Sequence, residues 1–96
     1  MTRAERLKRS RKSILRLAKR YGVTDIRVFG SAARGDDTPE SDIDFLIELE
    51  PNRSLFDVGG LLIELENLLG CKVDVLTEKS LHWYIRDRVL AEARPL

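Results

Sequence analysis

Two groups of residues in the first half of the chain have the types and the spacing of a site for phosphate chemistry. The first is Gly30 followed by Ser31, at the end of an apolar stretch. Glycine lets the backbone turn sharply and approach a ligand closely, and Ser31 is predicted to cap a short helix at about 31–35. The unpaired N–H groups at such a helix start suit a phosphate. Arg34 is expected either to hold a phosphate or to pair with a nearby carboxylate, and the sequence leaves both readings open.

The second group is a pair of aspartates, Asp42 and Asp44, at the start of a predicted strand at about 42–50. Residues two apart on a strand point to the same face, so both carboxylates project together. A hard divalent cation relieves their repulsion, and Mg²⁺ is commonly held by one or two carboxylates plus substrate phosphates. A glycine-serine turn alone is usually only a turn, and paired aspartates often lie on a solvated edge. Their combination in this order and spacing favours a phosphate site beside a metal site.

A third acidic side chain, Asp74, lies within the predicted strand at about 72–76. Val73 and Val75 are expected on one face of that strand and Asp74 on the other, where it can join Asp42 and Asp44. Aspartate is disfavoured inside strands, so its presence there needs a reason. The alternative reason is an edge-strand charge that blocks aggregation.

The remaining patterns indicate the elements that must position these side chains. Apolar residues recur at helical spacing in some segments and alternate with polar residues in others. Ser54 and Ser80 are predicted helix caps, and Gly22 and Gly70 are predicted helix ends. The predicted helices span about 3–21, 31–35, 55–69 and 79–93, and the predicted strands span about 24–29, 42–50 and 72–76.

This order of elements predicts an α/β (α+β) fold. We expect a small mixed β-sheet of three to four strands, with helices mainly on one face and the carboxylates on the other. A polar loop at 36–41 separates the two motifs, and no linker divides the chain. Residues 1–96 are therefore predicted to form a single domain.

Several further side chains have predicted places. Leu55 and Leu68 are expected on the apolar stripe of the helix at 55–69, and Trp83 and Tyr84 in the core or at an interface. A glycine pair at 59–60 suggests close packing against another backbone.

The first helix has an almost wholly basic outer face, which is either a solvated surface or a docking surface for an acidic partner or RNA. The lack of interleaved aromatic residues weakens the RNA reading. The members of this basic face are Arg3, Arg6, Lys8, Arg9, Arg11, Lys12, Arg16, Lys19 and Arg20.

Composition narrows the class of protein. The hydrophobic fraction of 43% is ordinary for a globular domain. The 17 basic and 16 acidic residues give a net charge of +1, so nucleic acid is not favoured as a partner, though it stays open, as does homo-oligomerisation. No apolar run approaches the roughly 18–20 residues of a membrane span, and no signal peptide is apparent. We expect a cytoplasmic protein without membrane contact.

The two motifs carry a resemblance. Residues 30–35 (GSAARG) and 41–44 (SDID) resemble the signature of the polymerase-β nucleotidyltransferase superfamily. Within it, the chain is similar to the minimal nucleotidyltransferase (MNT) group, the MntA-like antitoxins of bacteria and archaea. The similarity includes 55–57 (LFD) and the segment 73–76 (VDVL). It implies a nucleotidyltransferase-like fold, and it implies that Asp74 is the third catalytic carboxylate.

The resemblance also implies an activity and a partner. The chain would move AMP from ATP to a hydroxyl group, with two Mg²⁺ ions held by Asp42, Asp44 and Asp74. Gly30 and Ser31 would hold the β- and γ-phosphates. The acceptor implied by the MNT group is a tyrosine of a cognate HEPN-domain RNase toxin, so that the chain is the antitoxin of a type VII toxin–antitoxin pair. Two alternatives stay open: a non-catalytic antitoxin that masks its partner by binding, and a nucleotidyltransferase acting on a small molecule or an RNA end.

Overall fold

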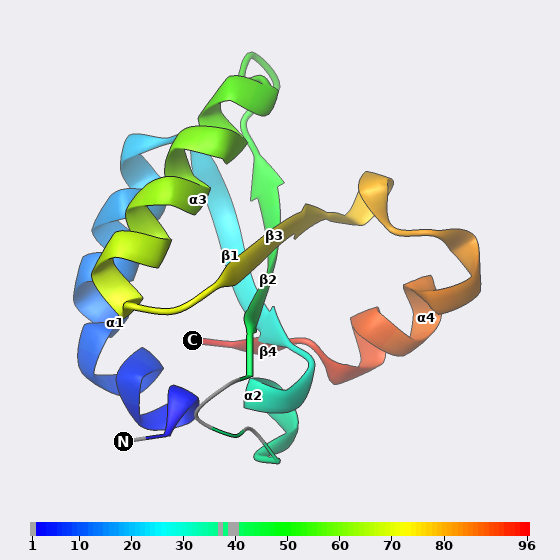
Figure 1. Cartoon of the computed structure of the whole chain (residues 1–96). Helices are drawn as coiled ribbons and strands as arrows, with labels where there is room; N and C mark the ends of the chain where they lie inside the picture. Colours follow the sequence, from blue (N-terminus) through cyan, green and yellow to red (C-terminus); the bar gives the residue numbers. More distant parts are fainter. Residues whose placement is uncertain (1, 37, 39–40) are drawn as a thin grey trace.

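A mixed β-sheet with helices on both sides positions the predicted site residues (Figure 1). The computed structural model describes residues 2–36, 38 and 41–96, so residues 37, 39 and 40 of the predicted polar loop lie outside the described residues. The prediction of a mixed sheet with three to four strands is confirmed. The elements are α1 (Arg3–Arg20), β1 (Val23–Phe29), α2 (Ser31–Arg34), β2 (Ile43–Leu49), α3 (Leu55–Leu69), β3 (Val73–Thr77), a 3₁₀ turn (Glu78–Ser80), α4 (Trp83–Glu92) and β4 (Arg94–Pro95).

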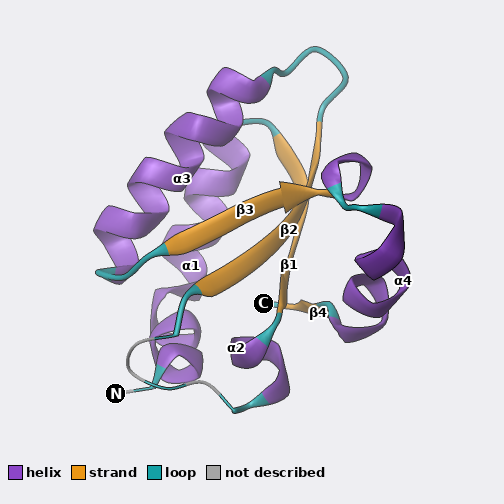
Figure 2. Cartoon of the chain, turned by 45° about the vertical axis from the view of Figure 1, so that its right-hand side comes forward, coloured by secondary structure: helices purple, strands orange, loops and turns teal. Residues whose placement is uncertain are grey.

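The strands of the described sheet follow the spatial order β3-β2-β1-β4. β1 runs antiparallel to both β2 and β4, whereas β2 and β3 are parallel. The parallel pair needs a long crossover, and α3 supplies it by passing over one face of the sheet. As a result, β2 and β3 both begin at the end of the sheet that carries α2 (Figure 2).

The main core lies between the sheet and the two long helices, α1 and α3, which lie side by side (Figures 1 and 2). From β2, the fully buried Ile43, Phe45 and Ile47 face these helices, as their alternation predicts. The helices contribute Leu7, Ile14, Ala18, Leu61, Leu65 and Leu69 to the same cluster. The predicted burial of this face of β2 is confirmed.

A smaller apolar cluster covers part of the opposite face. Phe29 and Leu46 of the sheet pack there against Leu81, which precedes α4, and against Val89, which belongs to α4. The two long helices thus share one face, while α4 shields the middle of the other. Asp44 projects from the same face as Leu46, because the two are two residues apart on β2, and it lies outside this apolar cluster.

Local signals explain the bounds of α1 and α3. Thr2 and Glu5 form a reciprocal capping box at the start of α1, and Ser54 and Asp57 form one at the start of α3. Gly70 ends α3 in the left-handed conformation, with φ of 68°. The predicted cap and the predicted stop of this helix are both confirmed.

The prediction for the last helix was wrong in detail. Ser80 does not cap α4, because residues 78–80 form a separate 3₁₀ turn in which Ser80 bonds to Thr77. α4 begins at Trp83, and its cap is His82, whose Nδ1 accepts a hydrogen bond of 3.1 Å from the Tyr84 amide.

Leu55 and Leu68 were wrongly assigned to the buried stripe of α3, and of the two alternatives for Trp83 and Tyr84 the core is wrong. Leu55 is 83% exposed and Leu68 39%, while Trp83 and Tyr84 are 78% and 77% exposed. Helical spacing predicts which side of a helix is buried, but not how far the burial extends around the helix or toward its ends. These residues lie at an end of their helix or at the edge of its buried side. Within the chain, Trp83 and Tyr84 are therefore not core residues.

The glycine pair of α3 packs differently from expectation. A Cβ on Gly60 would lie 2.6 Å from the Tyr21 ring, so this glycine makes room for an aromatic side chain rather than a backbone. A Cβ on Gly59 would meet no atom within 4 Å.

None of the helices in the described part of the chain is long and apolar enough to cross a membrane.

Candidate active site

Asp44 and Asp74 are direct partners in the parallel pairing of β2 with β3. Their flanking residues Ile43 and Val73 are buried on the helix side, so the two carboxylates project from the opposite face. The prediction that Asp74 joins Asp44 on one face of the sheet is confirmed. Asp42 lies one residue before β2 rather than within it, and it is half-buried.

The electrostatics of Asp44 reflect this crowding. Burial raises the pKa of its carboxyl group to about 6, and the charge of Asp74 and a hydrogen bond with it act in the same direction. Asp42 raises this pKa further, whereas the positive charge of Arg34 lowers it. Asp44 is thus held close to two like charges and to one cation. A carboxyl group with a pKa perturbed by burial and specific neighbours is typical of a functional site.

The backbone turn at Gly30 touches this cluster. Gly30 has φ of 73° and ψ of −154°, a backbone conformation that residues with a side chain rarely adopt. A Cβ built on Gly30 would collide with the Asp44 carboxylate, so only glycine lets the two approach. The predicted phosphate turn and the predicted carboxylates therefore meet at one place.

Ser31 does not have its predicted position. Gly30 is the N-cap of α2, and Ser31 is the first residue of this four-residue helix. The Gly30 carbonyl accepts bonds of 3.1 Å from the amides of Ala33 and Arg34. Because α2 is so short, any binding of phosphate here would depend on individual N–H groups and the Ser31 hydroxyl, and little on a helix dipole.

Arg34 connects α2 to the last helix. Its Nε donates to Asp36 at 3.3 Å and its Nη1 to Glu92 at 3.2 Å. Glu92 also lies 3.5 Å from Arg88. Of the two predicted roles, the structure shows the pairing with carboxylates, while the charge of Arg34 still acts on Asp44.

Two supporting residues were missed by the sequence reading. Arg3 was assigned to the exposed basic face, yet it is buried, and its Nε donates to the Ser41 carbonyl at 2.9 Å, next to Asp42. Helical spacing from Leu7 could have placed Arg3 on the inner face, because the two are four apart. Glu66 of α3 accepts a 3.1 Å bond from the amide of Val73, which precedes Asp74. Both contacts anchor backbone beside an aspartate.

The donor set fits a hard divalent cation. Asp42, Asp44 and Asp74 supply only carboxylate oxygens, the ligands that Mg²⁺ prefers. Burial is the largest cause of the raised pKa of Asp44, and repulsion from Asp74 and Asp42 adds to it. A divalent cation would relieve that repulsion. Among the described residues, no three acidic, histidine or cysteine side chains are gathered tightly enough to hold a metal as they stand.

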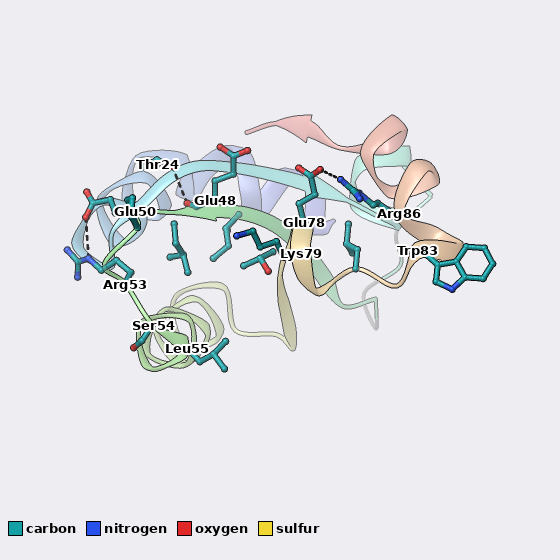
Figure 3. A pocket seen from close by; sticks show the side chains of 15 residues that line it. Thr24, Glu48, Glu50, Arg53, Ser54, Leu55, Glu78, Lys79, Trp83 and Arg86 are labelled. Atoms are coloured by element: carbon teal, nitrogen blue, oxygen red, sulfur yellow. Dashed lines mark hydrogen bonds and ion pairs between the residues drawn. The ribbon is translucent and has the colours of Figure 1, made fainter.

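A separate groove of about 850 Å³ lies beyond the far ends of β2 and β3 (Figure 3). Glu48, Glu78 and Lys79 line it, and Leu55 and Trp83 stand on different walls. None of the predicted site residues lines this groove. The groove therefore does not include Asp42, Asp44 or Asp74.

Comparison with known proteins agrees with this arrangement. Residues 7–96 match the family model of the nucleotidyltransferase domain. A protein of Methanocaldococcus jannaschii, by its name a candidate protein adenylyltransferase, is 42% identical over 83 residues, which cover 86% of this chain and 89% of the relative. The protein adenylyltransferase MntA of Thermococcus cleftensis is 42% identical over 76 residues, covering 79% of this chain and 77% of that one.

Solved structures show the same fold. A structure described as a minimal nucleotidyltransferase superposes with a TM-score of 0.88 at 43% identity, covering 100% of this chain and 97% of the other. A toxin–antitoxin complex with AMP-PNP has a chain that matches with a TM-score of 0.74 at 21% identity, covering 88% of this chain and 69% of that one, and this likeness concerns the fold alone. The chain belongs to the nucleotidyltransferase domain family, in its minimal, MntA-like group, and it is a nucleotidyltransferase.

Proposed function

We propose that this chain transfers AMP from ATP to a hydroxyl group of a partner protein. The observation that carries the proposal is the position of the Asp44 carboxylate, which lies against Asp74 on one side and against the Gly30 turn on the other. A site for metal-assisted phosphoryl chemistry needs carboxylates beside a phosphate-binding backbone, and this chain brings the two together.

The names of two relatives and the ligand of a structural neighbour indicate the nucleotide donor and the class of acceptor. Two proteins with 42% identity are named as protein adenylyltransferases, one of them as a candidate. A complex with the same fold was solved with AMP-PNP, an ATP analogue. These observations support ATP as the donor and a protein as the acceptor.

The reaction is a displacement at the α-phosphorus. The acceptor oxygen forms a bond to that phosphorus, the bond to the bridging oxygen of the β-phosphate breaks, and pyrophosphate leaves. The acceptor proton must pass to a base, and exposed Asp74 is the carboxylate best placed to receive it from an incoming group. Two Mg²⁺ ions, held by Asp42, Asp44 and Asp74, would supply stabilisation of the charge on the phosphate oxygens.

The remaining residues of the site would bind and orient the triphosphate. Gly30 and Ser31 would hold the β- and γ-phosphates through backbone N–H groups and the Ser31 hydroxyl. Arg34 would add positive charge beside them, exchanging its contact with Glu92 for a phosphate oxygen. Arg3 keeps the backbone before Asp42 in place. Catalysis by this chain would then consist of positioning and electrostatics.

The acceptor that we propose is a tyrosine of a HEPN-domain RNase toxin encoded with this chain. The solved toxin–antitoxin assemblies with this fold support a partner of that class.

The test uses ATP labelled at the α- or the γ-phosphate, with the purified chain and its co-purified partner. Label in the partner from the α-position alone would establish AMP transfer, and label from the γ-position would instead mean phosphate transfer. The Asp42→Asn/Asp44→Asn variant should transfer none. The matched control is Asp87→Asn, because Asp87 is an exposed aspartate on α4. A stable complex without label would favour a masking antitoxin, and label in a small molecule or RNA would favour the other alternative.

A further inference from the structure

The helix α1 concentrates positive charge that the net charge of the chain conceals. α1 carries 9 basic residues and 1 acidic residue, whereas the rest of the chain holds the remaining 8 basic and 15 acidic residues. The net charge is therefore +8 for the helix and −7 for everything else. A charge asymmetry of this size between segments indicates a surface that binds a polyanion.

The chain itself uses only four of the nine basic side chains of α1. Three of them donate to backbone carbonyls at 2.6–3.0 Å, and the fourth pairs with a glutamate; they are Arg3, Arg6, Arg11 and Arg20. The other five are exposed, and in the part of the chain that the structure describes their side chains make no hydrogen bond or ion pair. This set, which we call the basic stripe, consists of Lys8, Arg9, Lys12, Arg16 and Lys19.

The basic stripe runs along one side of the helix. Lys8, Lys12 and Arg16 are four apart, so their side chains lie one above another. The whole stripe, from position 8 to position 19, is about 16 Å long. Like charges at this spacing destabilise a helix, and Glu5, the acidic residue of α1, is bonded to Thr2 in the helix cap. A bound anion would offset this repulsion.

The composition of the stripe favours phosphates over an acidic protein surface. Protein interfaces are apolar at their centre and depleted of lysine. Three of the five stripe residues are lysines, and within α1 the large apolar side chain that is exposed is Leu15, at 37%, on the border of the stripe. The apolar side of α1 is buried against α3 and the sheet, so it is not available to enter a membrane. A row of phosphates is the partner that needs cations alone.

We propose that the basic stripe binds the phosphate backbone of duplex RNA. Single-stranded RNA is held largely through bases stacked on aromatic side chains, and the stripe has none. A helix that reads DNA enters the major groove, which is about as wide as the helix itself. α1 presents only its outer face, because α3 and the sheet cover the rest (Figure 1). Duplex RNA is recognised mostly by shape and backbone contacts, since side chains cannot read its deep major groove.

The stripe lies away from the active site. α1 packs on the sheet face opposite to the one from which Asp44 and Asp74 project (Figure 2). RNA bound to the stripe therefore leaves the carboxylates open. This inference goes beyond the proposed AMP transfer and does not depend on it.

The test is fluorescence anisotropy of the whole chain with a labelled RNA duplex of about 20 base pairs, without ATP or Mg²⁺. If each stripe cation neutralises one phosphate, log affinity should fall against log salt with a slope of about −4.5, which is about 500-fold between 50 and 200 mM salt. Lys12→Gln/Arg16→Gln should weaken binding at 50 mM salt at least about tenfold and make the slope less steep by about two.

Two controls separate the stripe from net charge and from catalysis. Lys79→Gln/Arg88→Gln removes one lysine and one arginine that are exposed outside α1, and it should bind with the wild-type affinity and slope. Asp44→Asn should also bind RNA like the wild type, so RNA binding and AMP transfer are measured separately. Thermal unfolding should show the stripe variant to be folded and at least as stable as the wild type, because two like charges four apart are removed.

The proposal is overturned if duplex RNA does not bind at 50 mM salt, or if both double variants lose the same affinity. It is also overturned if duplex DNA of the same sequence, or single-stranded RNA, binds as tightly as duplex RNA. Poly-glutamate that binds as tightly as duplex RNA would contradict it as well, and would identify an acidic protein surface as the partner of the stripe.

Discussion

The carboxyl groups of Asp44 and Asp74 meet across adjacent parallel strands, because the register of β2 and β3 pairs these two residues directly. One carboxylate belongs to the motif after the Gly30 turn, and the other follows α3 much later in the chain. The parallel crossover through α3 is what brings them together. A shift of either strand by one residue would turn its aspartate toward the core, so the apolar face of the sheet and the acidic site depend on the same register.

Replacing Asp44 by asparagine should abolish transfer while preserving the fold. The asparagine keeps the size of the side chain but removes the charge that a cation and the leaving group require, so the rate should fall at least about 100-fold. Circular dichroism should match that of the wild type. The control Asp87→Asn should retain full activity. Wild-type activity in the Asp44→Asn protein would mean that the chemistry lies elsewhere.

Stability should depend on pH through Asp44. Its pKa is about 6 in the folded chain, against an ordinary value of 3.8. The folded state therefore binds more protons than the unfolded state between about pH 4 and 6, and this group lowers the free energy of unfolding as pH rises through that window. A shift of this size corresponds to about 3 kcal/mol at full burial, but half-exposure to solvent reduces the expected effect to about 1 kcal/mol.

The measurement is urea unfolding of the wild type and Asp44→Asn at several pH values. The two proteins should be equally stable near pH 4, and the variant should be more stable by about 1 kcal/mol at pH 7. A constant difference over this range would show that Asp44 does not carry a raised pKa.

Mg²⁺ should stabilise the wild-type chain by relieving the repulsion between the carboxylates of the acidic cluster. At a concentration ten times its dissociation constant, a ligand of the folded state adds about 1.4 kcal/mol. The gain should shrink below pH 6, because protons compete for Asp44, and it should vanish in Asp44→Asn. Thermal denaturation with and without the ion measures it. An equal gain in the wild type and the variant would place the ion at another site.

Gly30→Ala should cost more than Gly35→Ala, although both glycines have positive φ, 73° and 81°. Either alanine pays the strain of the left-handed region, about 1–2 kcal/mol. Only the Cβ at position 30 meets the Asp44 carboxylate, whereas the one at position 35 meets nothing within 4 Å. We expect a further loss of about 1–3 kcal/mol for Gly30→Ala, together with loss of transfer. Equal stability and activity of the two variants would argue against a close approach at Gly30.

The sequence predicts best where a local signal and a tertiary role coincide. α3 has its predicted bounds, since Ser54 and Gly70 mark its two ends, and its buried leucines recur at helical spacing. Asp74 could be placed beside Asp44 because strand alternation fixes the face once parallel pairing is assumed.

Where only tertiary packing decides, prediction failed. The burial of Arg3 depends on the Ser41 carbonyl, a partner far along the chain. The start of α4 depends on a 3₁₀ turn that uses Ser80 for its own bonds. β4, only two residues long, forms through pairing with β1 and has no pattern of its own. Gly60 is explained only once Tyr21 is known to lie above it.

The central claim is that the acidic cluster transfers AMP to a partner protein. Its most direct test is the intact mass of the co-purified partner after incubation with ATP and Mg²⁺, with wild type beside Asp44→Asn. We predict a partner heavier by one or more AMP groups with the wild type alone, and tandem mass spectrometry should place them on tyrosine. A partner of unchanged mass in a stable complex with the wild type would contradict the account and leave inhibition by binding in its place.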